Sequence, residues 1–599
     1  MIRLLVDGQE VALSVDFSCE FYSQNPFFTK NGDYTYDIDI DLNNGNNRLI
    51  YQHINRADCT KRPDGRRVVI TSGPIVILRG LEVILSVEDN IVKIQVIADN
   101  SELNYLSAGN LTLRQMDLGY IRSGWQEYNR LNMFYPQSSY VCCPVLLQKG
   151  NYNISDFTPK TDVIYNEIEW DTSGGIQYKS GTEMMPQPFL LYCIDKIIEA
   201  LGYSIVENVL AQDTLACKLI VVNGVHSDEL SKLLPDWEVD KFITEIEKFF
   251  NVMFLADTNT KQVRILKVYD YYQSAQYQYI NAADLIDEVN KKFDQSESLY
   301  ITYDYIKFKL PSTPWYKYQA IPQDIKDKCG KTSAYFYEML GTSIEQHPYR
   351  LWYEAESRTT IIQNAIRTSD GSFNNWVICD ELAAYGNEAD NACEMAIIPA
   401  ETYNNNVWIT KGDFGGSKYY DGWITHILPV IANVSSSDKK DYAFEEIENG
   451  VSQEETNNSN IFISIYLGTR PYLYSSYYLG QEVPQPGIDA MKAPFAVACP
   501  WAIHSNRGAQ NFKLTKVAET DMSLAIETRY GGLFQRYYQQ NVKVDTKTEY
   551  IFKFKTNKIL DVKSIFVIAN KKYYCKELHY TVKANGLDSI VEGTFYLMD

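Results

Sequence analysis

The sequence lacks the short motifs by which most catalytic and nucleotide-binding sites are recognised. Its six histidines are scattered, and no two of them stand at the HExxH spacing of a zinc hydrolase. The chain has no GxSxG elbow, no GxxxxGK[ST] phosphate loop and no GxGxxG that follows a strand. We therefore expect a protein that is not an enzyme and needs no cofactor, and we assign no catalytic, cofactor-binding or metal-binding residue.

Closely spaced cysteines are missing as well. The eleven cysteines run from Cys19 to Cys575, only Cys142 and Cys143 are close, and no CxxC is present to begin a zinc site. Buried free thiols in a reducing cytoplasm are the expected state. No apolar run reaches the length of a signal peptide or a membrane span, so we expect a soluble chain made in the cytoplasm, without a membrane partner.

Positive charge is scarce. The 56 Lys and Arg residues face 76 Asp and Glu residues, which leaves a net charge of −20. A protein that binds nucleic acid tightly needs clustered basic residues, so nucleic-acid binding is not expected. An acidic wall repels a duplex, however, and therefore lets DNA pass without sticking to it.

Tyrosine is the abundant residue, with 46 copies against 25 of phenylalanine. Tyrosine can bury its ring while its hydroxyl group stays in contact with water, which suits sheets, interfaces and sugar-binding surfaces. The loop near residue 472 is especially rich in it, and a subunit contact or plain packing is favoured there over a sugar site. The candidate surface residues of this loop are Tyr472, Tyr474, Tyr477 and Tyr478.

The stretch YTYDIDIDLNNGN (34–46) places three acidic residues at alternate positions, Asp37, Asp39 and Asp41. Counted as an EF-hand from the first of them, the required glycine and glutamate positions hold Leu42 and Arg48, so that motif is excluded. A calcium-binding loop of another kind is the lesser alternative. The alternation predicts one half-buried strand, with both tyrosines, the isoleucines and Leu42 inward and the aspartates facing water or a cavity.

The pattern of the whole chain predicts an α+β protein, predominantly β, with several antiparallel barrel-like or sandwich-like domains and a helix-plus-hairpin unit in the middle. Apolar runs at 66–71, 74–79, 81–87 and 91–97 are separated by short turns, which favours an antiparallel meander or small barrel. The expected segments are 1–106 (β-barrel), 107–185 (β-rich connection), 186–310 (helix-hairpin domain), 311–460 (irregular insertion of unknown role) and 461–599 (C-terminal β-rich domain).

The middle unit contains the clearest helices. An apolar stripe from Leu190 to Leu201 followed by Gly202 predicts one helix, and LPDWEVDKFITEIEKFF (234–250) predicts a second that Asp236 caps. A hairpin turning at 257–261 follows it. A further short helix is expected near 282–292.

Several stretches together resemble the tail-tip or baseplate hub proteins of tailed bacteriophages and prophages, particularly those of Bacteroides-type bacteria. The N-terminal stretches are NPFFTKNGDYTYDIDIDLNNGNNRLIYQHINR (25–56) and VKIQVIADNSELNYL (92–106). LPDWEVDKFITEIEKFFNVMFLAD (234–257) is similar to the helix-then-strand unit of hub proteins. Near the C-terminus the matching stretches are IFISIYLGTRPYLY (461–474), SLAIETRYGGLFQRYYQQ (523–540) and IANKKYYCKELHYTV (568–582). Residues 311–460 match nothing in the family.

The resemblance implies a structural virion protein assembled in the host cytoplasm and located in the virion tail. Such hubs form rings, most often trimers, that join the tail tube to the distal tip and surround a DNA-conducting channel. The implied partners are further copies of the chain and other tail proteins (tube, distal tip, fibre or tape-measure proteins), with DNA passing without specific binding. Asp37, Asp39 and Asp41 are candidate channel-lining residues, although a solvated strand face is the simpler interpretation.

Two other functions remain open. The first is a receptor-binding or glycan-binding tail protein that uses its tyrosine-rich loops for host attachment. The second is a cell-wall hydrolase carried at the tail tip, which would need clustered acidic residues in a cleft.

Overall fold

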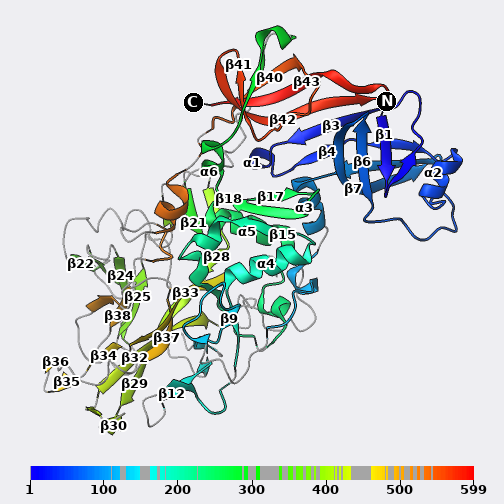
Figure 1. Cartoon of the computed structure of the whole chain (residues 1–599). Coiled ribbons are helices and arrows are strands. Elements are labelled where there is room, and N and C mark those ends of the chain that lie inside the picture. The colour runs from blue at the N-terminus through cyan, green and yellow to red at the C-terminus, as the bar shows by residue number, and fades with distance from the viewer. Residues whose placement is uncertain are drawn as a thin grey trace.

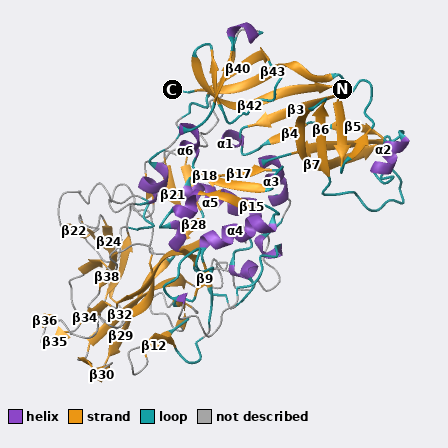
Figure 2. Cartoon of the chain, viewed as in Figure 1, coloured by secondary structure: helices purple, strands orange, loops and turns teal. Residues whose placement is uncertain are grey.

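The computed structural model describes a mostly β chain with a few helices (Figures 1 and 2). The described residues are 2–108, 111–121, 130–148, 162–170 and 176–293 (apart from 183, 226, 287 and 288), 305–309, strands between 336 and 516 with the residues that join some of them, 522–526, and 532–598 (apart from 541 and 543). Figure 2 shows strands at both ends of the molecule and most of the helical residues between them.

The largest element is one 14-stranded sheet built from both ends of the chain, with strand order β2-β1-β6-β7-β8-β4-β3-β42-β43-β40-β20. Its N-terminal strands are β1 (Ile2–Val6), β2 (Gln9–Val11), β3 (Ser18–Gln24), β4 (Asp33–Thr35), β5 (Ile38–Asp41), β6 (Arg67–Ser72), β7 (Ile75–Glu88) and β8 (Ile91–Ile97). The others are β19 (Tyr277–Ile280), β20 (Asn290–Phe293), β40 (Thr548–Lys555), β41 (Ile565–Ile568), β42 (Lys571–Lys583) and β43 (Gly586–Leu597).

The two ends of the chain meet where β3 pairs with β42. This antiparallel pairing runs from Ser18 opposite Lys583 to Gln24 opposite Glu577, and we call it the seam. Figure 1 shows it as blue and red strands side by side. Phe21 and Tyr580 stack on its inner face, with ring centroids 5.5 Å apart, so one hydrophobic core serves both ends of the chain.

The strand order does not return to its starting strand, so no closed barrel is found among the described residues. Within the N-terminal part, the buried side chain of Asn47 bridges Ala12, which follows β2, and Asp41, the last residue of β5. Its amide oxygen accepts from the Ala12 backbone nitrogen at 2.8 Å, and its amide nitrogen donates to the backbone oxygens of Ala12 and Asp41, both at 2.9 Å. Asn47 lies on α2 (Gly45–Ile50).

The middle unit has the predicted helix-plus-hairpin form. Its elements are α4 (Leu190–Ala200), β15 (Ser204–Asn208), α5 (Val239–Phe250), β17 (Met253–Asp257), β18 (Gln262–Leu266) and α6 (Val268–Gln273). Gly202 ends α4 at φ +83°, as predicted, because that left-handed conformation suits glycine. The N-cap of α5 is Glu238 rather than Asp236, and no side chain caps this helix.

Two other local predictions were wrong. Where a short helix was expected near 282–292, the described residues form a 3₁₀ turn at Ala282–Asp284 and strand β20 from Asn290, because pairing with β40 overrides the local helical preference. The runs at 74–79 and 81–87 form the single strand β7, with Gly80 inside the strand and not in a turn. Glycine is required there because β8 lies so close that a Cβ on residue 80 would be 2.2 Å from the Ile97 oxygen.

The remaining described elements continue the chain between these units. Their helices are α1 (Pro26–Thr29) and α3 (Asn100–Ser107). The strands before residue 310 are β9 (Tyr140–Val141), β10 (Val145–Gln148), β11 (Asp162–Tyr165), β12 (Ile168–Trp170), β13 (Ile176–Tyr178), β14 (Gln187–Pro188), β16 (Leu219–Val221) and β21 (Tyr305–Phe308). Those from 336 to 432 are β22 (Phe336–Met339), β23 (Tyr349–Glu354), β24 (Thr359–Arg367), β25 (Phe373–Ile378), β26 (Ala384–Tyr385), β27 (Ala392–Met395), β28 (Ile397–Pro399), β29 (Glu401–Ile409), β30 (Gly412–Phe414), β31 (Ser417–Tyr419) and β32 (Gly422–Ala432). The last are β33 (Ile461–Pro471), β34 (Leu473–Ser475), β35 (Tyr477–Tyr478), β36 (Gln481–Glu482), β37 (Lys492–Val497), β38 (Trp501–His504) and β39 (Lys513–Lys516).

We expect Asn25, at the end of β3, to stabilise the seam. Its buried amide nitrogen donates to the Cys575 oxygen at 2.8 Å, the Val562 oxygen at 3.0 Å and the Tyr272 hydroxyl at 3.1 Å. Asn25→Ala leaves these buried groups without their partner and should lower the opening free energy of β3 and β42 by about 2–3 kcal/mol. Hydrogen exchange of peptides from both strands measures this loss, and Asn46→Ala, on the surface, is the control. Equal protection in both variants would refute the role of Asn25.

Candidate interaction surface

Four aromatic side chains gather on the outer face of the large sheet, over the seam. They are Tyr22 on β3, Tyr34 and Tyr36 at β4, and His579 on β42, and we call them the aromatic patch. Tyr22 is central: its ring centroid lies 4.4 Å from that of His579, 5.5 Å from that of Tyr34 and 5.0 Å from that of Tyr36. Tyr36 is 48% exposed, and the patch therefore opens to solvent.

The patch exists because the predicted strand at 34–42 is broken. β4 ends at Thr35 and β5 begins at Ile38, and the inward-facing side changes between them. Thr35 is buried on the same side as the later isoleucines, whereas Tyr36 turns outward, and its backbone nitrogen donates to the Glu20 oxygen at 2.9 Å. The prediction that both tyrosines face the core is therefore wrong.

Acidic and amide groups surround the patch. Glu20 is exposed, and its Oε2 lies 3.5 Å from the Nε2 of His579. Gln24 donates to the Glu577 carboxylate at 2.9 Å. Burial, followed by the nearby charge of Glu20, raises the pKa of Tyr22 to about 12. An aromatic centre with a polar rim is the composition of many protein interfaces.

Of the predicted aspartates, Asp37 directly follows Tyr36 of the patch, and Asp39 and Asp41 lie further along, on β5. Asp37, Asp39 and Asp41 are all exposed, as their alternation predicts. Asp39 stands opposite Lys93 in the β5–β8 pairing, and the Oδ1 of Asp41 accepts from the Asn43 backbone nitrogen at 2.8 Å. In the part of the chain that the structure describes, no group of three or more His, Cys, Asp or Glu side chains is arranged to hold a metal ion. Whether these aspartates line a channel stays a prediction.

The tyrosine-rich loop is only partly described. Tyr474 lies on β34, which pairs with β32, and Tyr477 and Tyr478 form β35, which pairs with β36. Tyr472 lies outside the described residues. The structure therefore places the backbone of three of these residues in strands and leaves their role as a binding surface a prediction.

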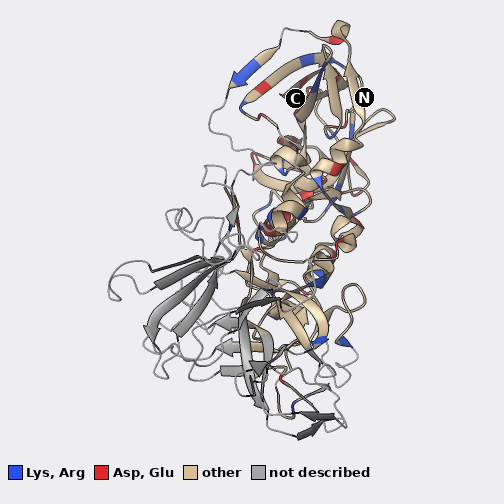
Figure 3. Cartoon of the chain, turned by 90° about the vertical axis from the view of Figure 1, so that its left-hand side faces the viewer, with Lys and Arg blue, Asp and Glu red and all other residues tan. Residues whose placement is uncertain are grey.

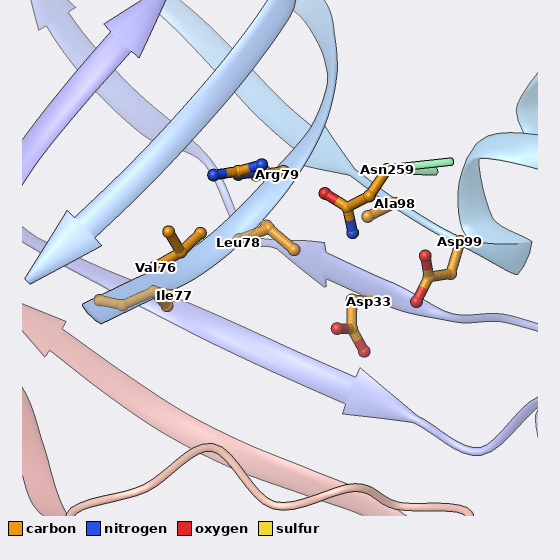
Figure 4. Close-up of a pocket in the computed structure, with 8 residues that line it drawn as sticks. All are labelled: Asp33, Val76, Ile77, Leu78, Arg79, Ala98, Asp99 and Asn259. Atoms are coloured by element: carbon orange, nitrogen blue, oxygen red, sulfur yellow. The ribbon is translucent and has the colours of Figure 1, made fainter. Parts of the chain in front are cut away.

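A polar hollow of about 410 Å³ opens where the large sheet meets the turn between β17 and β18. Figure 4 shows the carboxyl groups of Asp33 and Asp99 in it, with Asn259 of the turn nearby. The hydroxyl of Ser23 donates to Asp33 at 2.6 Å, and the Thr258 backbone nitrogen donates to Asp99 at 3.1 Å. The Ser23–Asp33 bond stays within the sheet, between β3 and β4, whereas the Thr258–Asp99 bond connects the sheet to the middle unit. We call this connection between the sheet and the middle unit the joint.

Burial shapes the charge of this pair. Burial, and after it the nearby charge of Asp99, raises the pKa of Asp33 to about 7. Burial also raises the pKa of Asp99, whose backbone has the strained φ of +52°. The strained residue lies directly before α3, where the chain leaves the sheet and enters the joint.

Glu102 on α3 completes the joint between the sheet and the middle unit. Its carboxylate is fully buried and accepts two hydrogen bonds of 2.9 Å from Arg67 on β6, and it also pairs with Lys261 of the β17–β18 turn. Although burial opposes ionisation, these cations lower the pKa of Glu102. Asn100 adds hydrogen bonds to the Phe254 oxygen at 2.6 Å and from the Ala256 nitrogen at 3.1 Å.

The other composition-based expectations concern thiols and membranes. The cysteines within the described ranges are free thiols, most of them buried. No helix among the described residues is long and apolar enough to cross a membrane.

Comparison with known proteins gives distant similarity to phage tail proteins. No protein-family model matches the chain, and no curated protein matches it. Among solved structures, the chain is similar to the 43 kDa tail protein of prophage MuSo2 from Shewanella oneidensis, with 7% identity, a TM-score of 0.28, and coverage of 100% of this chain and 98% of the other. A tail protein from Neisseria meningitidis MC58 gives 7% identity, a TM-score of 0.26, and coverage of 100% and 96%. Scores of this size do not establish a common fold.

Asp33, which lies beside the joint, should make the stability of the folded chain depend on pH. A carboxyl group whose pKa is raised on folding stabilises the folded state at low pH, and this contribution disappears as pH rises from about 4 to about 7. Asp33→Asn keeps an acceptor for Ser23 and removes the charge. We expect it to raise stability at pH 7.5 by on the order of 1 kcal/mol, and by less at pH 5.

Thermal unfolding at the two pH values measures this difference. Asp37→Asn, a surface change on the neighbouring segment, is the matched control. A variant that is less stable than the parent chain at pH 7.5 would contradict the proposed burial of charge at Asp33.

Proposed function

We propose that the chain is a structural component of a bacteriophage tail. In this proposal it is a hub or tail-tip protein that forms a ring, most simply a trimer, between the tail tube and the distal tip. The observation that carries the proposal is the seam. The segments that resemble hub proteins lie far apart in the sequence, yet β4, β5 and β8 from one end and β42 from the other belong to the same sheet.

The third resembling segment, the helix and strand at 234–257, is attached to that sheet. Asn100 pairs with the backbone of β17, and Glu102 binds Lys261 at the end of the same hairpin. Resemblances that were separate in the sequence therefore belong to one connected part of the molecule. This is what a shared architecture requires, since unrelated matches have no reason to meet in space.

The surface of this part suits assembly. Tyrosines are common at the centre of protein interfaces, and the aromatic patch offers three of them beside a histidine. The net charge of −20 suits a protein that surrounds DNA without holding it, because phosphates find no attractive site on an acidic wall. Asp37, Asp39 and Asp41 are the proposed channel-lining residues.

Receptor or glycan binding at the tail is the second candidate. The same patch favours it, because exposed rings with nearby carboxylate and amide groups can also bind a sugar. The two functions differ in their dependence on assembly. A hub requires contacts between chains, whereas a glycan-binding protein binds its ligand whether or not it associates.

Light scattering on a size-exclusion column, over a range of concentrations, tests the ring. We expect a stable mass three times that of the 68.9-kDa chain. Antibody labelling of purified phage particles in electron micrographs then places the protein, with label expected at the tail tip. Particles whose tails carry no label would refute the tail function, and a monomer that binds sugars on a glycan array would favour the second candidate.

A further inference from the structure

β20, the edge strand of the large sheet, carries positive charge, whereas the residues around the aromatic patch are acidic. β20 lies at one end of the strand order, pairs with β40 and is exposed at every residue. Phe293 is 73% exposed, and Lys291 and Lys292 precede it. The strand is visible as the blue arrow at the upper left of Figure 3. Lysines are common on edge strands, but an aromatic ring as exposed as that of Phe293 beside them marks a candidate contact surface.

The lysines of β20 are held only loosely within their own chain. The Nζ of Lys292 lies 3.7 Å from Glu549, and its side chain remains 68% exposed. Lys291 lies over the ring of Tyr550, 5.1 Å from its centroid. Contacts of this kind contribute little to stability, so both ammonium groups are available to a partner.

The aromatic patch presents the complementary groups. Tyr36 is 48% exposed, and Glu20 and Asp37 are exposed beside it. An inserted aromatic ring would contact tyrosine rings, and flanking ammonium groups would meet carboxylates. The charges and the aromatic side chains of β20 therefore complement those of the patch.

A chain cannot bring its own β20 to its own patch. In the strand order, β42, β43 and β40 lie between β3, which carries Tyr22, and β20. Adjacent strands are about 4.8 Å apart, so the two features are separated by roughly 19 Å within one rigid sheet. The match can be made only between two copies.

We propose that β20 of one copy docks on the aromatic patch of the next, with Phe293 against Tyr36 and Lys291 against Glu20. The contact joins two different surfaces, so it is head-to-tail, and repeated around an axis it closes a ring. This inference rests on the proposed ring-forming function and names the surfaces that would build the ring.

A charge exchange tests the contact. Lys291→Glu and Glu20→Lys should each raise the dissociation constant of the assembly by about tenfold, because each places like charges together. An equimolar mixture of the two should recover part of the affinity, since β20 of the Lys291→Glu chain then meets the patch of the Glu20→Lys chain with opposite charges. The double variant in a single chain should recover nearly all of the affinity.

Two control variants should leave the dissociation constant unchanged. One is Lys555→Glu, at an exposed lysine on the neighbouring β40, and the other is Tyr120→Ala, at an exposed tyrosine elsewhere.

Cross-linking covers the case in which association is weak. Two differently tagged chains, one carrying Phe293→Cys and the other Tyr36→Cys, are mixed and treated with a short bismaleimide. We expect a mixed dimer at several times the yield obtained when Tyr120→Cys replaces Tyr36→Cys.

The outcomes separate this contact from the proposed function. An assembly that forms normally in Lys291→Glu and Glu20→Lys would overturn the contact and leave the ring in place. A monomer whose cross-linking does not exceed the control would also overturn it, and labelling of phage tails would then decide the function independently. Loss in each single variant with recovery in the double variant supports the contact.

Discussion

Seven residues of β3 pair with seven residues of β42, and the arrangement of the large sheet depends on this pairing. The partners are separated by more than 500 residues of sequence, as the bond from Asn25 to the Cys575 oxygen illustrates. Closing an unstructured loop of that length costs roughly 6 kcal/mol in entropy. A folded middle unit shortens the effective loop, so the seam is best formed after that unit has folded. The aromatic patch draws its side chains from both ends of the chain and is complete only once the seam has closed.

Buried polar groups fix how the sheet meets the middle unit. Apolar surfaces alone would allow the two to slide, because hydrophobic contact has no direction. Asn25, Asn100 and Glu102 each have a bond to the middle unit, to Tyr272, Phe254 and Lys261 respectively, and only one relative position satisfies all three. A buried group that loses its partner is costly, and the joint therefore specifies orientation as well as attachment. The carboxyl groups of Asp33 and Asp99, whose pKa values burial raises, lie in the same region.

The sequence predicted elements that are set by local pattern and missed those that are set by distant pairing. The stripe from Leu190 and the glycine at 202 were sufficient for α4, because both signals are local. No local pattern near residue 290 predicts that Asn290–Phe293 form an edge strand, since the partner strand β40 begins more than 250 residues later. The alternating pattern correctly predicted that Asp39 and Asp41 of β5 face solvent. Tyr34 and Tyr36, which precede them, were wrongly placed on the core side, because the strand breaks after Thr35. This break follows from the pairing of β4 with both β3 and β8. The patch itself could not be predicted, since His579 reaches it only through the seam.

Hydrogen exchange on the intact chain tests the seam most directly. If the two ends form one sheet, peptides from β3 and β42 will share a high protection against exchange and will lose it together as urea is added. Independent loss of protection in the two strands, or rapid exchange of β3 while β42 stays protected, would contradict the account.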